Sequence, residues 1–476
     1  MTETAAIFDL DRTLLAGASG PVFSEAMRDA GVLPGRSNPL EPLLFRIFEA
    51  VGENSPTMWF TRQAVRVTRG WSRDDVRAAA RRATPALEAK VLPYARQLLE
   101  EHRREGRLLV LATTTPDDLA RPLAEALGFD HVIANRYGTA PDGTYDGTVE
   151  GEYVWGKGKA RAVRAWADEN GVDLSESYAY SDSYYDVPLL SLVGHPSATN
   201  PDPRLRAIAA LRRWPARWFD VPATVPKFAG LEPQRAVMTF ARAELFPWVR
   251  FRIYGAQHIP KEGAAILIAN HRSYFDPLAI GFALAKRGRT VRFLGKKEVF
   301  DVPVVGDLTR AMGGIRVDRA TGSDQPLVEA EEALAAGDLV AVMPQGTIPR
   351  GREFFNPELK GRWGAARLAH ASKVPVIPIG LWGTERVWPR SSKVPNLTNL
   401  VHPPTVTIRV GKPVALEYDD LDADTVRMMS AITSLLPPEA QRTHEPTPEE
   451  LARTMPSGRA DDADDDREAS RRPGTD

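Results

Sequence analysis

Short apolar runs alternate along this chain with segments in which apolar residues recur at helical spacing. The runs with the length and make-up of buried strands are 5–8, 107–112, 178–180, 264–269, 340–343 and 374–379. Polar or hydroxyl-bearing residues follow most of them directly. Strands alternating with helices, with polar groups at the carboxyl ends of the strands, are typical of a doubly wound sheet whose site lies along one edge. The pattern therefore predicts an α/β fold.

A chain of 476 residues is too long for one hydrophobic core, and 43% apolar residues suffice for two. We predict a first α/β domain with a Rossmann-like sheet over 1–210, with a helical cap inserted at about 16–90. A proline-containing linker is expected over 211–235 and a second α/β domain over 236–436. The polar, acidic segment 437–476 is expected to be a disordered tail.

The charge balance and the absence of cysteine narrow the function further. The 61 basic and 62 acidic residues nearly cancel, which gives no reason to expect nucleic-acid binding. Without cysteine there can be no disulfide or thiolate metal site, as suits a reducing compartment. Neither a signal peptide nor an apolar stretch near 20 residues is visible, so we expect a cytoplasmic protein that does not span a membrane.

Basic and aromatic residues alternate in 211–219, and 236–251 is apolar with arginine and tryptophan at its edges. An interfacial helix on an anionic leaflet has this make-up, and so does a helix packed on the second domain. Both readings stay open. The first predicts peripheral contact with the inner face of the cell membrane.

The first candidate site begins with Asp9 and Asp11, which follow strand 5–8 in an Asp-x-Asp-x-Thr motif. Two acids at this spacing can share a hard cation, Asp9 through its side chain and position 11 through its backbone carbonyl. A solvated acidic loop is the simpler alternative. Further along, Thr113 ends the second strand, Lys159 lies in a predicted helix, and an Asp-x-x-x-Asp motif closes the series.

Taken in this order, the motifs resemble those of the haloacid dehalogenase-type phosphatases, in particular the phosphoserine-phosphatase-like subgroup, over residues 5–210. The resemblance implies that Asp9 attacks a phosphomonoester to form an aspartyl-phosphate, while Asp11 serves as acid and then base. Thr113 and Lys159 would hold the phosphoryl group, with Lys157 as a rival for the lysine. The implied Mg²⁺ ligands are Asp9, Asp11, Asp182 and Asp186. The serine-specific members carry a glutamate shortly after the first motif, and this chain has Leu-Leu-Ala-Gly there, so phosphoserine is not supported as substrate.

The second candidate site begins with His271 and Asp276, five residues apart after the run 264–269. On a continuous helix these side chains would point about 140° apart, so they can meet only if the chain turns between them. Asp276 precedes Pro277 and an apolar helix, so it is also a candidate N-cap.

Further blocks follow in a fixed order. Gly313 permits a close backbone approach, and Arg319 can grip a phosphate or pair with a nearby acid. The strand 340–343 then runs into the turn Gln345, Gly346, Thr347.

Together with the strand 374–379, these blocks resemble the glycerolipid acyltransferases that convert 1-acylglycerol-3-phosphate to phosphatidate, over about 235–415. The resemblance implies that His271 removes the proton of a lysophospholipid hydroxyl as it attacks an acyl thioester, either acyl-CoA or acyl carrier protein, while Asp276 orients the imidazole. The acceptor's glycerol phosphate would be bound by Gly313, Arg319, Gln345, Gly346 and Thr347. No metal is implied in this domain.

The third block departs from the family, which has glutamate at position 345 and arginine at 348, where this chain has Gln345 and Ile348. Arg350 or Arg352 can replace the missing guanidinium. The leading hypothesis is a bifunctional phospholipid-biosynthesis enzyme. The alternative is an active phosphatase fused to a catalytically altered, lipid-binding domain.

Overall fold

The computed structural model describes residues 3–33, 65–227, 230–240, 245–303, 305–317 and 325–456. The chain divides into two compact units, Met1–Ala223 and Thr224–Asp476, and each is described by itself. Part of the predicted cap (34–64), Arg319 and most of the predicted tail (457–476) lie outside the described residues.

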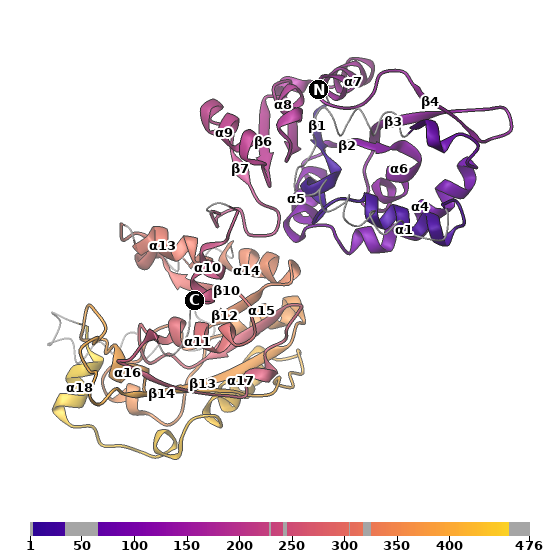
Figure 1. The fold of residues 1–476 in the computed structure, drawn as a ribbon. Helices are drawn as coiled ribbons and strands as arrows, with labels where there is room; N and C mark the ends of the chain where they lie inside the picture. Colours follow the sequence, from indigo (N-terminus) through magenta and orange to yellow (C-terminus); the bar gives the residue numbers. More distant parts are fainter. Residues whose placement is uncertain are drawn as a thin grey trace. The chain divides into compact units, whose positions relative to one another are not determined.

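The first unit is built on a seven-stranded sheet in the order β4-β3-β2-β1-β5-β6-β7 (Figure 1). The strands are β1 (Ala5–Phe8), β2 (Leu108–Pro116), β3 (His131–Thr139), β4 (Tyr145–Glu150), β5 (Tyr178–Ser181), β6 (His195–Thr199) and β7 (Ala216–Arg217). The helices are α1 (Gly20–Asp29), α4 (Arg73–Glu88), α5 (Pro93–Arg104), α6 (Asp117–Ala126), α7 (Lys157–Asn170), α8 (Val187–Leu190) and α9 (Pro203–Arg212). Only β4 is antiparallel to its neighbour.

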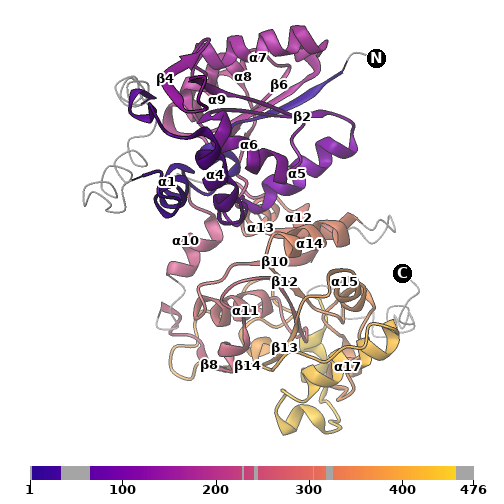
Figure 2. The ribbon, with the colours of Figure 1, turned by 90° about the vertical axis from the view of Figure 1, so that its right-hand side faces the viewer.

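Helices cover both faces of this sheet, as its nearly continuous apolar strands require. Figure 2 shows α7 on one side of the strands and α4, α5 and α6 on the other. Alternate residues of β1 enter separate cores, with Phe8 packing among residues of α5 and α6 and Ile7 among residues of α7 and α8. The described parts of the predicted cap form α1 and α4, which share the core of Phe8.

The second unit has another seven-stranded sheet, in the order β11-β10-β12-β9-β13-β14-β8. Its strands are β8 (Arg250–Tyr254), β9 (Ala265–Ala269), β10 (Val291–Lys296), β11 (Gly314–Val317), β12 (Leu339–Val342), β13 (Val376–Trp382) and β14 (Thr405–Val410). Its helices are α10 (Pro233–Thr239), α11 (Asp276–Ala285), α12 (Lys297–Phe300), α13 (Val305–Ala311), α14 (Gln325–Ala335), α15 (Gly364–Ser372), α16 (Thr384–Val387), α17 (Leu421–Thr433) and α18 (Pro448–Thr454).

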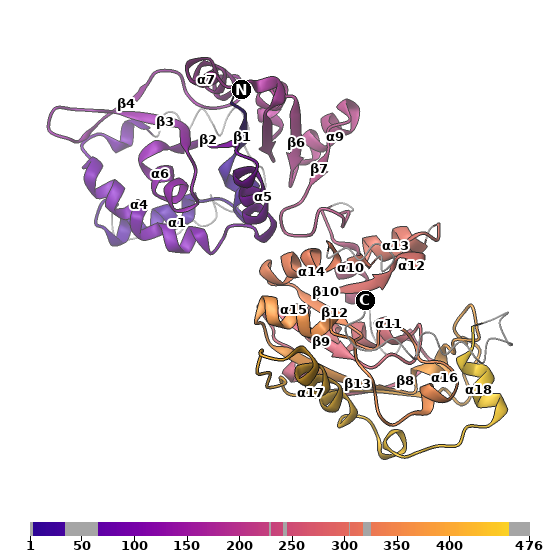
Figure 3. The ribbon, with the colours of Figure 1, turned by 180° about the vertical axis from the view of Figure 1, so that it is seen from behind.

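Five strands of this sheet, from β11 to β13, run parallel, and β14 reverses direction next to β13. The core on one face contains residues of α11, and the core on the other face contains residues of α14, α15 and α17 (Figure 3). The strand β9 is buried along its whole length between these two cores. The carboxyl ends of the parallel strands therefore meet at one edge.

Two mixed α/β sheets with helices confirm the predicted fold class. Among the helices of the described ranges, none combines the length and hydropathy needed to cross a lipid bilayer.

Two candidate active sites

The first candidate site lies on an irregular turn that follows β1. Arg12 adopts a left-handed conformation (φ 59°), which reverses the chain directly after Asp9. Asn200, which follows β6, fastens this turn: its Nδ2 donates to the carbonyl oxygens of Arg12 (2.8 Å) and Thr13 (3.2 Å). The Asn200 Oδ1 accepts a hydrogen bond from the Phe219 backbone N–H (3.1 Å). The conformation of the turn that carries Asp9 thus depends on residues almost 200 positions away.

Asp9 and Asp182 meet at the hydroxyl of Thr13. The Thr13 Oγ1 lies 3.4 Å from Asp9 Oδ2 and 3.3 Å from Asp182 Oδ1, and it accepts the Asp182 backbone N–H (3.0 Å). The Nε of Arg12 donates to the other oxygen of Asp182 at 2.9 Å. The parallel pairing of β1 with β5 brings these acids together, because both strands end at the same edge.

Lys159 is almost completely buried and bridges two acids. Its Nζ donates to Asp9 Oδ1 (2.8 Å) and to Asp186 Oδ2 (2.7 Å). Ser181 also donates to Asp186 Oδ2, whereas Asp186 Oδ1 is buried and has no hydrogen-bond partner. Lys157, the rival considered above, is exposed. The ammonium of Lys159 therefore offsets part of the negative charge that Asp9 and Asp186 bring together.

The carboxylate of Asp11 turns toward two other groups. It accepts the Ser19 backbone N–H (2.5 Å) and the hydroxyl of Thr115 (3.2 Å). The sequence pattern gave no indication of this contact between Thr115 and Asp11. Thr113 is buried near the end of β2, where its Oγ1 accepts the Thr115 backbone N–H.

Burial raises the pKa of Asp9 to about 6. The neighbouring charge of Lys159 opposes this effect, and the negative charges of Asp186 and Asp11 add to it. An additional cation at this position would favour the charged form of Asp9 further.

A magnesium ion was predicted on Asp9, Asp11, Asp182 and Asp186. Within the described ranges no three acid or imidazole side chains form a ready cage, because Asp11 faces Ser19 and Asp186 faces Lys159. Mg²⁺ is usually bound by one or two carboxylates, with water and substrate oxygens as its other ligands. The convergence of Asp9 and Asp182, both oxygen donors, fits that requirement.

The second candidate site lies at the carboxyl end of β9. The Nδ1 of His271 is 2.8 Å from Oδ2 of the fully buried Asp276, and the same oxygen accepts the backbone N–H groups of Arg272 (2.6 Å) and Ser273 (2.8 Å). The chain therefore turns between the two residues, as their meeting requires. Asn270 fixes the turn to β13 by exchanging two hydrogen bonds with the backbone of Leu381.

The expected N-cap role of Asp276 was wrong. The helix α11 begins at Asp276 itself, and Phe275 is its N-cap. The carboxylate is used instead by the preceding turn, whose three donors converge on one oxygen. A sequence pattern alone does not separate these roles, because both need an acid just before a helix.

Gln345, which follows β12, contacts the turn that carries His271 directly. Its Oε1 accepts the backbone N–H of His271 at 2.7 Å. An amide oxygen makes this bond as well as a carboxylate does, so the departure from the family's glutamate is compatible with an ordered site. Gly346 has φ 72° in the turn that follows, and Thr347 accepts a hydrogen bond from the Nζ of Lys296 at the end of β10 (3.2 Å). Lys296 was not predicted as a site residue.

Gly313, another predicted substrate-binding residue, has a clear structural role. It has φ 79°, and a Cβ there would lie 2.5 Å from Nη1 of the buried Arg292. Arg292 is held by Glu232 (2.6 Å) and Asp338 (2.8 Å). The glycine therefore permits the close approach of this buried ion-pair network to β11.

Arg272, the residue after His271, was also missed by sequence reasoning. Its guanidinium lies between the rings of Phe354 (4.2 Å) and Trp382 (4.3 Å), and its Nε is 3.1 Å from Glu385. Stacking and pairing on a planar guanidinium restrict its rotation. The backbone at His271 is thus held by Gln345, which accepts its N–H, and by the restrained side chain of the next residue, Arg272.

Two family models match the chain. The haloacid dehalogenase-like hydrolase family matches residues 6–191, and the acyltransferase family matches residues 250–382. The match regions contain Asp9 and Asp182 in the first case and His271, Asp276 and Gln345 in the second.

Individual proteins are similar to parts of this chain. The inhibition of morphological differentiation protein of Streptomyces azureus is 35% identical over 247 residues, which are 51% of this chain and 88% of that protein. A phosphoserine phosphatase of Mycobacterium tuberculosis is 35% identical over 229 residues, covering 46% of this chain and 71% of that protein. The solved 1-acyl-sn-glycerophosphate acyltransferase of Thermotoga maritima is 24% identical, with a TM-score of 0.30, and covers 41% of this chain and 80% of that one. The chain therefore belongs to the haloacid dehalogenase-like hydrolases, and its residues 250–382, which follow the hydrolase match, match the acyltransferase family model.

Proposed function

We propose that this protein is a bifunctional phospholipid-biosynthesis enzyme that acylates 1-acylglycerol-3-phosphate to phosphatidate and hydrolyses a phosphomonoester. The observation that carries the first activity is the 2.8 Å contact between His271 and the buried Asp276. A buried carboxylate beside Nδ1 selects the imidazole tautomer that carries its proton there, and the Nε2 lone pair remains available as a base.

In the proposed transfer, Nε2 of His271 takes the proton of the acceptor hydroxyl while the oxygen attacks the thioester carbonyl carbon. The carbon–sulfur bond then breaks, and the departing thiolate recovers the proton from the imidazolium. Asp276 stabilises the charged imidazole during this interval. Base catalysis of this kind supplies about 10² to 10⁴ in rate, so positioning of the two substrates must supply the rest.

The acceptor phosphate is proposed to bind beside the turn after β12. Lys296 and Thr347 are joined there at 3.2 Å, and Gly346 has a φ of 72°, which glycine adopts readily. Arg319 and Gly313, predicted from the family pattern, remain candidates. The ammonium of Lys296 supports an anionic group at this position.

For the phosphatase, we infer that Asp9 attacks the phosphorus of the substrate and forms an aspartyl-phosphate. Asp11 protonates the leaving oxygen and then takes a proton from the attacking water. Lys159 and Thr113 hold the phosphoryl oxygens. Mg²⁺ bound at Asp9 and Asp182, with support from position 11 and Asp186, would neutralise part of the phosphoryl charge.

We further propose that the acyltransferase domain works at the cytoplasmic surface of an anionic membrane. Val394, Leu397, Leu400 and Val401 are each more than half exposed on the loop between α16 and β14. This loop follows Trp388, whose carbonyl accepts the Ser273 hydroxyl at 2.6 Å, so it starts beside the catalytic turn. Exposed apolar residues next to the site support delivery of a lipid acceptor from a bilayer.

The deciding assay offers radiolabelled acyl-CoA and lysophosphatidate to the wild type, Asp9→Asn and His271→Ala. We expect labelled phosphatidate from the wild type and Asp9→Asn, and none from His271→Ala. With Mg²⁺, the wild type and His271→Ala should hydrolyse a chromogenic phosphomonoester, and Asp9→Asn should not. If none of the three proteins makes phosphatidate but each still binds lipid, the result would support the alternative that the second domain is catalytically altered and only binds lipid.

Membrane contact is tested by co-sedimentation with vesicles of phosphatidylglycerol. The wild type should sediment, and a Leu397→Asp, Leu400→Asp variant should stay in the supernatant. Equal sedimentation of both forms would remove the loop from the proposal.

A further inference from the structure

A pocket of about 490 Å³ lies in the phosphatase domain, at the edge of the sheet beyond β6. Its origin is a mismatch in strand length, because β7 pairs only with Ala198 and Thr199 and leaves the first half of β6 unpaired on the side away from β5. The chain after α9 turns at Arg213, which is left-handed (φ 57°), and passes alongside this open edge. The pocket therefore lies beside the first residues of β5 and β6, whereas Asp9 and Asp182 follow the last residues of β1 and β5.

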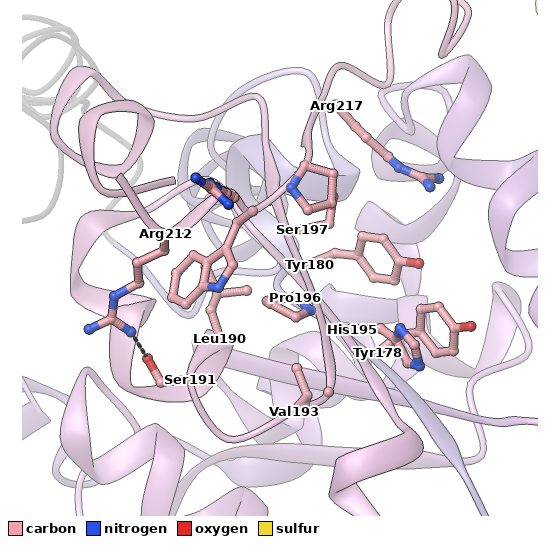
Figure 4. A pocket seen from close by; sticks show the side chains of 14 residues that line it. Tyr178, Tyr180, Leu190, Ser191, Val193, His195, Pro196, Ser197, Arg212 and Arg217 are labelled. Atoms are coloured by element: carbon pink, nitrogen blue, oxygen red, sulfur yellow. Dashed lines mark hydrogen bonds between the residues drawn. The ribbon is translucent and has the colours of Figure 1, made fainter. Parts of the chain in front are cut away.

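The lining of this edge pocket is basic and contains no acid. Arg212, Arg213, Arg217 and His195 contribute to it. Arg212 already has a hydrogen-bond partner, because it donates to the Ser191 hydroxyl at 2.6 Å, as the dashed line in Figure 4 marks. Among the described residues, Arg213 and Arg217 form no ion pair. Two guanidiniums without a carboxylate partner in one concave site favour an anionic ligand.

A buried hydroxyl adds a second, independent indication. Ser197 is only 3% exposed, and among the described residues its Oγ has no hydrogen-bond partner although the residue lines the pocket. In the strand register Ser197 lies opposite Tyr180, so both side chains belong to the same face of the sheet. Figure 4 shows these two residues together with Arg217 around the pocket. A buried hydroxyl without a partner costs free energy that a bound acceptor would recover.

The Tyr180 hydroxyl can donate its proton in a hydrogen bond in the same part of the pocket. Arg107 donates to Nδ1 of His102 (2.9 Å), which leaves the ring proton on Nε2, facing the Tyr180 oxygen at 2.8 Å. Burial, together with the charges of Arg107 and Arg217, lowers the pKa of His102 to about 4. His102 is therefore neutral near pH 7, and the phenolic proton is left for another acceptor.

The remaining lining is apolar or aromatic, with Leu190, Val193 and Trp214 next to the arginines. We propose that this pocket is a second ligand site that binds a small phosphorylated organic molecule. The phosphate pairs with the guanidiniums of Arg213 and Arg217 and accepts from the Ser197 hydroxyl, and the organic part packs on the apolar side chains. This site is separate from the edge of the sheet where Asp9 and Asp182 lie.

The geometry also connects this pocket to the nucleophile. The backbone carbonyl of Tyr180 accepts the backbone N–H of Asp9 at 3.0 Å, while the Tyr180 side chain lines the pocket. A ligand that orders Tyr180 thus acts one hydrogen bond away from the phosphatase turn.

The test is isothermal titration calorimetry of the full chain with Mg²⁺, using phenylphosphonate and inorganic phosphate. Phenylphosphonate resists hydrolysis and joins a planar ring to the anion. We expect a second site beyond the catalytic one, weakened at least tenfold in the Arg213→Ala, Arg217→Ala variant. Arg204→Ala, an exposed arginine of α9 outside the pocket, is the matched control and should bind like the wild type.

Ser197→Ala removes only the buried hydroxyl and should weaken the same site about tenfold, because one hydrogen bond to a charged group contributes about 1.5 kcal/mol. Turnover of 4-nitrophenyl phosphate at saturation should stay unchanged in all variants, which shows that they fold. Phenylphosphonate should bind this site more tightly than inorganic phosphate. Equal affinities of this site for phenylphosphonate and inorganic phosphate would refute the proposal that the ligand has an organic part. A single binding site in the wild type, or unchanged binding in the pocket variants, would refute the proposal that this pocket binds a ligand.

Discussion

The contact between Gln345 and the His271 backbone predicts a distinctive kinetic effect. Gln345→Ala removes the acceptor of a 2.7 Å hydrogen bond and leaves a partly buried N–H without a partner. Such a loss costs about 1–3 kcal/mol. Since the bond positions the base and need not touch the acceptor, we expect kcat for acyl transfer to fall about 10- to 100-fold with KM little changed.

Gln345→Glu is the matched control, because a carboxylate oxygen can accept the same N–H. It should retain most of the wild-type kcat. The assay follows labelled phosphatidate over a range of lysophosphatidate concentrations at saturating acyl-CoA, with circular dichroism to confirm folding.

A different result would refute this reasoning. If Gln345 instead binds the acceptor phosphate, both variants should raise KM, and the glutamate should raise it more because it repels the phosphate. An unchanged kcat in Gln345→Ala would show that the contact does not position His271.

Three further effects are expected. Lys159→Met removes the cation between two buried acids and should lower phosphatase kcat/KM at least about 10²-fold in a chromogenic assay, while acyl transfer is unaffected. Gly313→Ala should lower the unfolding free energy by about 2 kcal/mol in urea titrations, because its φ is 79° and its Cβ would collide with Arg292, whereas Gly337→Ala, with φ 84° but open space, should cost less. Burial alone would raise the pKa of Asp424, but hydrogen bonds from the Glu417 backbone and His370 lower it from 3.8 to about 2. The stability from this group is present above pH 3.8 and lost as pH falls toward 2, and Asp424→Asn should flatten that part of a stability–pH profile.

The parts of the fold that follow from local patterns were predictable. Apolar runs placed strands such as β1 and β9, and the parallel arrangement then required Asp9 and Asp182 to finish at one edge. The five-residue spacing of His271 and Asp276 implied a turn, which the structure contains.

The parts that depend on long-range contacts were not predictable. Arg272 pairs with Glu385, 113 positions away, and nothing in its local sequence distinguishes it from a surface arginine. Lys296 became a site residue only when β10 was placed two strands from β9. The contact of Gln345 with His271 was not predictable for the same reason, since its partner is a backbone group that no motif records.

Asn200 has a practical consequence for anyone shortening this protein. The hydrolase family match stops at residue 191, yet the amide that holds the loop after Asp9 comes later in the chain, and it is itself anchored by Phe219. A fragment trimmed at the match limit would keep every acid of the first centre and lose the brace that shapes it. An autonomous phosphatase fragment should therefore extend through Phe219, and a ribosome-bound chain would gain this activity only after that residue has emerged.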